Sequence, residues 1–149
     1  EGDRHRGTSH APRRAVRAAL GGGVGARVTL FHYTCNHGRV GIGDDGWLRP
    51  AQTFWGGEPL IWLTDMDVPD RAGLGLTSRI LSCDRLDYRY VAEAHGAEPW
   101  LTSSFRIAAP WKAVLALEAI EGVKPHHWWV SARRLRARFD AAYAKPEAA

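Results

Sequence analysis

The pattern of apolar and polar residues divides the chain at Val28. Residues 1–27 contain few large apolar side chains, show no sustained periodicity and end in a glycine-rich run, which predicts a disordered basic extension. The pattern predicts a single domain over residues 28–142 and a frayed tail over residues 143–149. The sequence does not begin with methionine, and a natural start at Val28 is a hypothesis that mass spectrometry of the native amino terminus would test.

Four segments of the predicted domain indicate strands. Residues 28–34 form a β-branched and aromatic run, which is typical of a buried strand, and residues 60–64 form a second one. Residues 86–91 alternate between apolar and polar side chains, the period of a half-buried strand. A late strand is predicted to begin near Trp128 and Trp129 and to continue into a basic segment.

The remaining segments predict a few helices and loops. Residues 36–46 indicate a short helix or turn, and residues 109–122 have apolar residues at helical spacing and end in a glycine. Residues 95–105 are predicted to be loop, and residues 71–85 fit either loop or strand. The order of elements indicates an α+β fold, because it lacks the regular strand–helix alternation of a doubly wound sheet.

The net charge of +4 belongs to the predicted extension rather than to the domain. Residues 1–27 contain six arginines against Glu1 and Asp3, and the rest of the chain has equal numbers of basic and acidic side chains. A globally basic nucleic-acid-binding domain is therefore not indicated, although four arginines form a local basic patch: Arg133, Arg134, Arg136 and Arg138. The sequence shows no apolar run of about 18 residues and no secretory signal, so we expect a cytoplasmic protein without a membrane partner.

Three side chains near the end of the first predicted strand are of types that bind zinc. They are His32, Cys35 and His37, with Cys83 as a candidate fourth ligand. Structural zinc sites usually contain two spaced ligand pairs, whereas this chain has one loose cluster, so the sequence favours no metal. We expect Cys35 to be a buried free thiol and His37 to be exposed. A disulfide between the two cysteines stays open.

The seven tryptophans favour a well-packed core, since most buried indoles serve packing. One or two of them could instead form an aromatic wall on which a planar ligand ring stacks.

The segments LFHYT, DGWLRP and IWLTD resemble, in order and spacing, the first strand, a glycine-containing turn and the second strand of the ADP-ribosyltransferase superfamily. The resemblance covers residues 28–66 and the rest of the chain in outline. It implies a small split-sheet α+β domain with few short helices, in which NAD lies as co-substrate between two small sheets. It also implies cleavage of the nicotinamide–ribose bond and transfer of ADP-ribose to a macromolecule, either nucleic acid or protein. Small size and a strong arginine bias suggest a bacterial toxin or a phage-encoded modifier.

The resemblance also implies roles for individual residues in binding NAD. His32 would hydrogen-bond a ribose hydroxyl, and Tyr33 or Thr34 would support the strand edge that binds the nicotinamide amide. The ring that stacks on nicotinamide would be one of three aromatic residues: Trp62, Tyr88 and Tyr90.

The sequence departs from the family where a catalytic glutamate usually begins a late strand, because His126 or His127 stands there. Either Glu93 or Glu98 supplies the carboxylate, or the chain resembles branches without it, such as the tRNA 2′-phosphotransferases, which bind NAD with histidine and arginine. Phosphates would then be held by an arginine from this set: Arg49, Arg79, Arg89 and Arg106. The candidate catalytic residues are His32, His127 and Glu98, Arg49 is the leading phosphate ligand, and loss of activity is a third outcome.

The alternative function is a non-catalytic module that binds nucleic acid or nucleotides. In that case the aromatic residues stack on bases and the arginines follow the phosphates. The acceptor and the oligomeric state stay open.

Overall fold

The computed structural model describes residues 27–76 and 83–143. Residues 1–26 of the predicted basic extension lie outside the described residues, as do residues 77–82 and 144–149. In the described part, an antiparallel seven-stranded sheet has the order β2-β7-β4-β1-β3-β6-β5. The strands are β1 (Leu30–Thr34), β2 (Trp47–Leu48), β3 (Ile61–Thr64), β4 (Tyr88–Ala92), β5 (Glu98–Pro99), β6 (Trp128–Ser131) and β7 (Leu135–Phe139).

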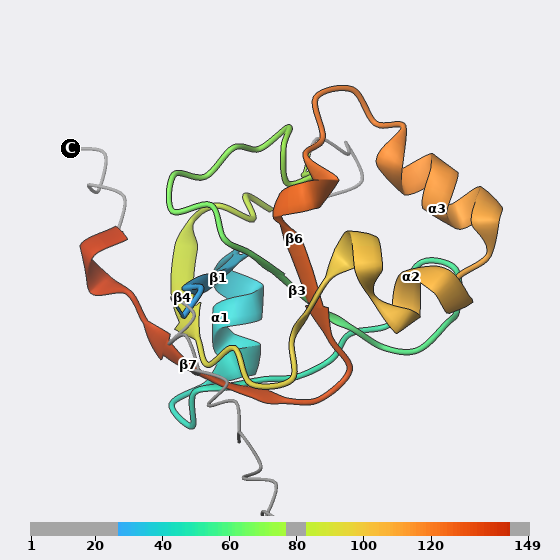
Figure 1. Ribbon diagram of the computed structural model, residues 1–149. Coiled ribbons are helices and arrows are strands. Elements are labelled where there is room, and N and C mark those ends of the chain that lie inside the picture. The colour runs from blue at the N-terminus through green and yellow to red at the C-terminus, as the bar shows by residue number, and fades with distance from the viewer. Residues whose placement is uncertain (1–26, 77–82, 144–149) are drawn as a thin grey trace, which may run out of the picture.

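Within residues 27–76 and 83–143, three short α-helices and three 3₁₀ turns accompany the sheet, so helix and strand are mixed as in an α+β protein. The helices are α1 (Asn36–Ile42), α2 (Ser104–Ala108) and α3 (Trp111–Glu118), and the turns are η1 (Trp100–Thr102), η2 (Pro125–His127) and η3 (Ala141–Tyr143). Helix α1 lies beside β1 and β4, whereas α2 and α3 lie beyond β6 on the other side of the molecule (Figure 1). No helix of the described residues has the length and apolar character needed to cross a bilayer.

The strands predicted at residues 28–34, 60–64 and 86–91 are confirmed as β1, β3 and β4. The loop prediction for residues 95–105 is wrong, because this segment contains β5, η1 and the start of α2. Strand β5 is a strand because it pairs with β6. The local sequence does not reveal this pairing.

The prediction of one late strand is also wrong. Residues 128–139 form two strands, β6 and β7, because the chain turns between them. At this turn the Ser131 hydroxyl accepts a hydrogen bond from the Arg133 amide at 3.1 Å and donates one to the Arg133 carbonyl at 2.9 Å. Helix α3 ends at Glu118, before the predicted stop at Gly122, whose φ of 80° serves the turn after the helix.

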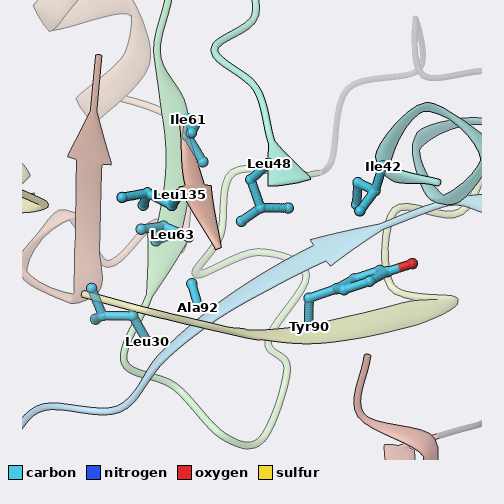
Figure 2. Close-up of a cluster of buried hydrophobic side chains, with 8 residues drawn as sticks. All are labelled: Leu30, Ile42, Leu48, Ile61, Leu63, Tyr90, Ala92 and Leu135. Atoms are coloured by element: carbon cyan, nitrogen blue, oxygen red, sulfur yellow. The ribbon is translucent and has the colours of Figure 1, made fainter. Parts of the chain in front are cut away.

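The buried hydrophobic side chains of the described residues form three groups. The largest group joins β1, β3, β4 and β7 to α1 and β2, and Figure 2 shows its eight members: Leu30, Ile42, Leu48, Ile61, Leu63, Tyr90, Ala92 and Leu135. A second group around Trp100 and Trp128 packs β6 against α3 and η1. A third group, built on Phe31 and Tyr33, lies on the opposite face of β1.

Tyr143 belongs to the domain, although residues 143–149 were predicted to be a tail. Its ring packs edge-on against Tyr33 at a centroid distance of 5.4 Å, and its hydroxyl donates to the Leu86 carbonyl at 2.9 Å. The ordered domain therefore extends at least to this residue.

Helix α1 approaches β1 closely because residue 38 has no side chain. A Cβ atom placed on Gly38 would overlap the hydroxyl oxygen of Thr34, and Thr34 is only 2% exposed. A buried, β-branched threonine has little freedom to move aside, so this contact requires glycine.

A hydrogen-bonded network centred on Glu118 fastens α3 to η1 and α2. The Glu118 carboxylate accepts hydrogen bonds from the Trp100 indole at 2.8 Å and from the Arg106 guanidinium at 2.7 and 2.9 Å. The guanidinium, together with the indole hydrogen bond, lowers the pKa of Glu118 against the opposing effect of burial.

We expect Glu118→Gln to lower the free energy of unfolding at neutral pH by about 1 to 3 kcal/mol, the usual worth of hydrogen bonds to a charged group. The folded-state pKa lies below the unfolded value of about 4.3, so the stabilisation is complete above that value and is lost as the pH falls through the folded one. Urea titrations across the acid range should therefore show parent and variant converging. The exposed Glu121→Gln is the matched control, and a pH-independent difference at Glu118 would contradict this account.

Candidate functional site

A cavity of about 660 Å³ is lined by residues of β1 and β3. These strands are neighbours in the sheet, but their register contains the single pair Phe31–Thr64, whereas β1 and β4 share five pairs. The short pairing leaves backbone groups of β3 available to side chains instead of to the sheet. The cavity has the size of a small-molecule or cofactor site.

The cavity wall is mainly aromatic and aliphatic, with few charged groups. Its charged or titratable side chains, among the described residues, include His32, Arg49 and Arg85. The aromatic lining residues are Phe31, Tyr33, Trp47, Phe54, Trp55, Trp62 and Trp128. An apolar wall with a few polar groups is the usual composition of a ligand pocket.

His32 is held in one tautomer by the backbone of β3. Its Nδ1 atom lies 3.0 Å from the Trp62 carbonyl oxygen, and because a carbonyl only accepts, Nδ1 carries the hydrogen. Burial lowers the pKa of His32, the bond to the Trp62 carbonyl acts in the opposite direction, and the nearby Arg85 charge lowers it further. The ring is therefore neutral, and its Nε2 atom is a lone-pair acceptor without a partner among the described residues.

Two further lining residues carry buried polar atoms that no described group satisfies. They are the Thr53 hydroxyl oxygen and the Arg85 Nε atom. Burying such a group without a hydrogen bond costs about 1 to 3 kcal/mol, and most buried polar atoms in proteins avoid this cost. Both atoms lie in residues that line the cavity.

Four of the predicted NAD-binding residues besides His32 also line the cavity: Tyr33, Thr34, Trp62 and Arg49. The Tyr33 hydroxyl donates to the carbonyls of Met66 and Asp67 at 2.9 and 3.1 Å, so its polar end serves the fold. The Arg49 guanidinium pairs with Asp45 at 2.6 Å on the exposed surface.

Trp62 packs within an aromatic cluster. Its ring lies 4.9 Å from that of Trp100 and 6.0 Å from that of Trp128, between centroids. It belongs at once to the core and to the cavity wall.

The other predicted site residues do not line this cavity. Glu98 lies on β5, where its carboxylate accepts a hydrogen bond from the Ser104 amide at 3.1 Å. Tyr88 packs beneath the Arg39 guanidinium at 4.9 Å. His127 forms a 2.5 Å contact with Asp65 at the end of β3. The structure therefore places all three residues outside the cavity that His32 lines.

The arginines predicted to hold phosphates have different environments. Arg89 is paired with Asp140 at 2.6 Å, and Arg106 is paired with Glu118, so both serve structural ion pairs. Arg79 lies outside the described residues. Arg85 was missed because it falls in a segment without clear periodicity, and nothing in the local pattern placed it beside His32.

The two cysteines and His37 come together at the end of β1. Cys35 is buried and His37 exposed, as predicted, and both cysteines are free thiols. Burial acts to raise the pKa of Cys35, but hydrogen bonds with Cys83, the Gly38 backbone and His37 outweigh it and lower the pKa to about 7. His32 is not part of this cluster, because its ring is bound to Trp62.

Comparisons of the chain with protein-family models, with curated proteins and with solved structures find no match. The function of the protein is therefore inferred from its own residues and from the geometry of the cavity.

We expect the His32 ring to remain neutral, with the hydrogen on Nδ1, at pH values below its ordinary pKa of about 6.5. Long-range ¹H–¹⁵N spectra, assigned by comparison with His32→Gln, would report both the tautomer and the charge. The unfolded chain takes up a proton near that pH while the folded ring resists it. The contribution of His32 to the free energy of unfolding is thus complete above about pH 6.5 and is lost as the pH falls toward the folded-state pKa of His32. A hydrogen on Nε2, or titration at or above 6.5, would contradict the assignment.

Proposed function

We propose that the cavity binds NAD as a co-substrate and that the protein transfers ADP-ribose to a macromolecule. The observation that carries this proposal is the presence of a histidine with a lowered pKa, His32, and an arginine, Arg85, in the lining of a largely apolar cavity. The resemblance of LFHYT, DGWLRP and IWLTD to ADP-ribosyltransferases supports it. On this proposal the seven-stranded sheet, with its short β1–β3 pairing, corresponds to the split sheet of that family.

Each of these groups suits one part of a dinucleotide. The His32 Nε2 lone pair accepts a hydrogen bond from a ribose hydroxyl, which is the match that a neutral imidazole offers. The Arg85 guanidinium complements the diphosphate, because arginine pairs with phosphate oxygens through charge-assisted hydrogen bonds. The aromatic wall offers planar surfaces to the nicotinamide or adenine ring.

The chemistry requires little from the protein beyond position and electrostatics. The bond between ribose C1′ and the nicotinamide nitrogen breaks, its electron pair goes to the nitrogen, and the ring leaves uncharged. An acceptor oxygen or nitrogen forms the new bond to C1′ and releases its proton. Holding the ribose at His32 and the diphosphate at Arg85 would fix C1′ for attack.

The charged groups of the wall favour a histidine–arginine type of site over a glutamate-dependent one. Among the described residues that line the cavity, none is an aspartate or glutamate. This composition supports the branch of the resemblance that includes the tRNA 2′-phosphotransferases. Glu98 then serves the contact between β5 and α2 and takes no part in the reaction.

We expect the parent protein to bind NAD in isothermal titration calorimetry and Arg85→Gln to bind it about 10- to 100-fold more weakly, the equivalent of a lost hydrogen bond to a charged group. The Arg85 Nε atom has no hydrogen-bond partner among the described residues, so Arg85→Gln should remain folded. His32→Ala should also weaken binding. The matched control is Arg138→Gln, an exposed arginine outside the cavity.

Absence of NAD binding by the folded parent at millimolar NAD would overturn the proposal. Equal affinities of the parent and Arg85→Gln would overturn the assignment of the diphosphate to Arg85. Release of nicotinamide from NAD, followed by chromatography, separates an active transferase from a protein that only binds the dinucleotide.

Nucleic-acid binding is a second candidate function, and one observation favours it. The guanidinium groups of Arg134 and Arg136 lie over the Trp47 ring at 4.5 and 4.6 Å from its centroid. Trp47 lies on β2, lines the cavity and pairs directly with Arg136 on β7. The basic strand thus borders the cavity, where it would hold a nucleic acid either as the acceptor or as the only ligand.

We expect the double variant Arg134→Gln/Arg136→Gln to bind single-stranded nucleic acid more weakly than the parent and with a salt dependence reduced by about 1.4 in the slope of log K against log salt. NAD affinity should not change in this variant. Fluorescence anisotropy over a range of salt concentrations measures the slope. A slope equal to that of the parent would show that these arginines make no phosphate contact.

A further inference from the structure

We propose that Cys35, His37 and Cys83 form a binding site for a divalent cation of the zinc class. The site joins two segments that are distant in sequence, the β1–α1 junction and the chain that precedes β4. Its three candidate ligand atoms lie within 4.8 Å of one another. This inference does not depend on the proposed function.

The spacing of the ligand atoms is close to that around a tetrahedral zinc ion. With zinc–sulfur bonds of about 2.3 Å and zinc–nitrogen bonds of about 2.0 to 2.1 Å, sulfur and nitrogen ligands lie about 3.6 Å apart. The distance from Cys35 Sγ to His37 Nδ1 is 3.9 Å. A shift of a few tenths of an ångström in an exposed histidine would therefore complete this edge of the tetrahedron.

The chemistry of the ligand set selects the class of metal. Two thiolates and an imidazole are soft or borderline ligands, which favour zinc over magnesium or calcium. Three protein ligands leave a fourth position for water, the arrangement of an open zinc site. The sequence favoured no metal because it lacks a second spaced pair of ligands, but the fold brings Cys83 to Cys35 and His37.

A disulfide between the two cysteines is the competing use of the same sulfur atoms. A disulfide requires a sulfur–sulfur distance of about 2.05 Å and leaves His37 without a role. The metal site uses all three side chains, and His37 Nδ1 is already within hydrogen-bonding range of the Cys35 sulfur. The arrangement of the histidine therefore favours the metal.

The bound metal would fasten the segment that carries Arg85 to the segment that carries Thr34. Cys83 precedes Arg85 by two residues, and Cys35 directly follows Thr34. Both Arg85 and Thr34 line the cavity. A bound metal would thus close a long loop of the chain, and closing a long loop gives the largest stabilisation in principle.

The test is Zn²⁺ and Co²⁺ binding to the full chain without a histidine tag, reduced and freed of metal. We expect one ion per chain, a cobalt–thiolate charge-transfer absorption, and protection of both thiols from a thiol reagent when Zn²⁺ is bound. Cys83→Ser and His37→Ala should each weaken Zn²⁺ binding by at least about 100-fold, since even the partners of metal ligands contribute about 10- to 100-fold.

His37 is exposed, so His37→Ala tests the site without disturbing the core. The matched control is His95→Ala, an exposed histidine in the loop after β4, which should bind Zn²⁺ like the parent. Three results would each overturn the proposal. The first is that the reduced, folded parent binds no stoichiometric Zn²⁺. The second is that His37→Ala binds Zn²⁺ with the affinity of the parent. The third is that the purified protein contains a Cys35–Cys83 disulfide and still binds no Zn²⁺ after reduction.

Discussion

The arrangement of the molecule depends on the point at which β1 stops pairing with β3. Among the described residues, Phe31 and Thr64 are the pair in register, and the His32 ring also bonds to the Trp62 carbonyl. A side chain thus takes the place of a backbone donor. This bond links β1 to β3, prevents an unsatisfied carbonyl in the interior and fixes the tautomer of an imidazole that lines the cavity.

The buried side chains of the described residues form groups of different composition. Around β1, β4 and β7 the core is mainly aliphatic and is covered by α1, whose close approach depends on the lack of a side chain at Gly38. Around β6 the core is built from indole rings and is covered by η1, α2 and α3, which the Glu118 carboxylate holds together. The aliphatic group also contains Ile61 and Leu63 of β3, so it extends across the contact between β1 and β3.

The sequence predicted the elements that follow from a local pattern of residues and missed those that depend on pairing between distant segments. Alternation and β-branched runs indicated β1, β3 and β4, and helical spacing indicated α3, whereas the segment of α1 was predicted as a short helix or turn. Strand β5 was missed because it depends wholly on β6. The same limit applies to the site: His32 stands out within its strand, but its tautomer depends on a carbonyl thirty residues away. Arg85 and Cys83 become meaningful only once the fold places them beside β1.

The strand order has a consequence for how the chain folds during synthesis. Strand β2 finds its partner in β7, near the end of the domain, and β3 pairs with β6, which also comes late in the chain. Contacts of such long sequence separation make folding slow, because the loops must close before the contacts form. Until β7 has left the ribosome, the apolar face of β2 and the edge of β4 stay without their partners. The nascent chain therefore remains open to misassociation until nearly all of the domain has been made.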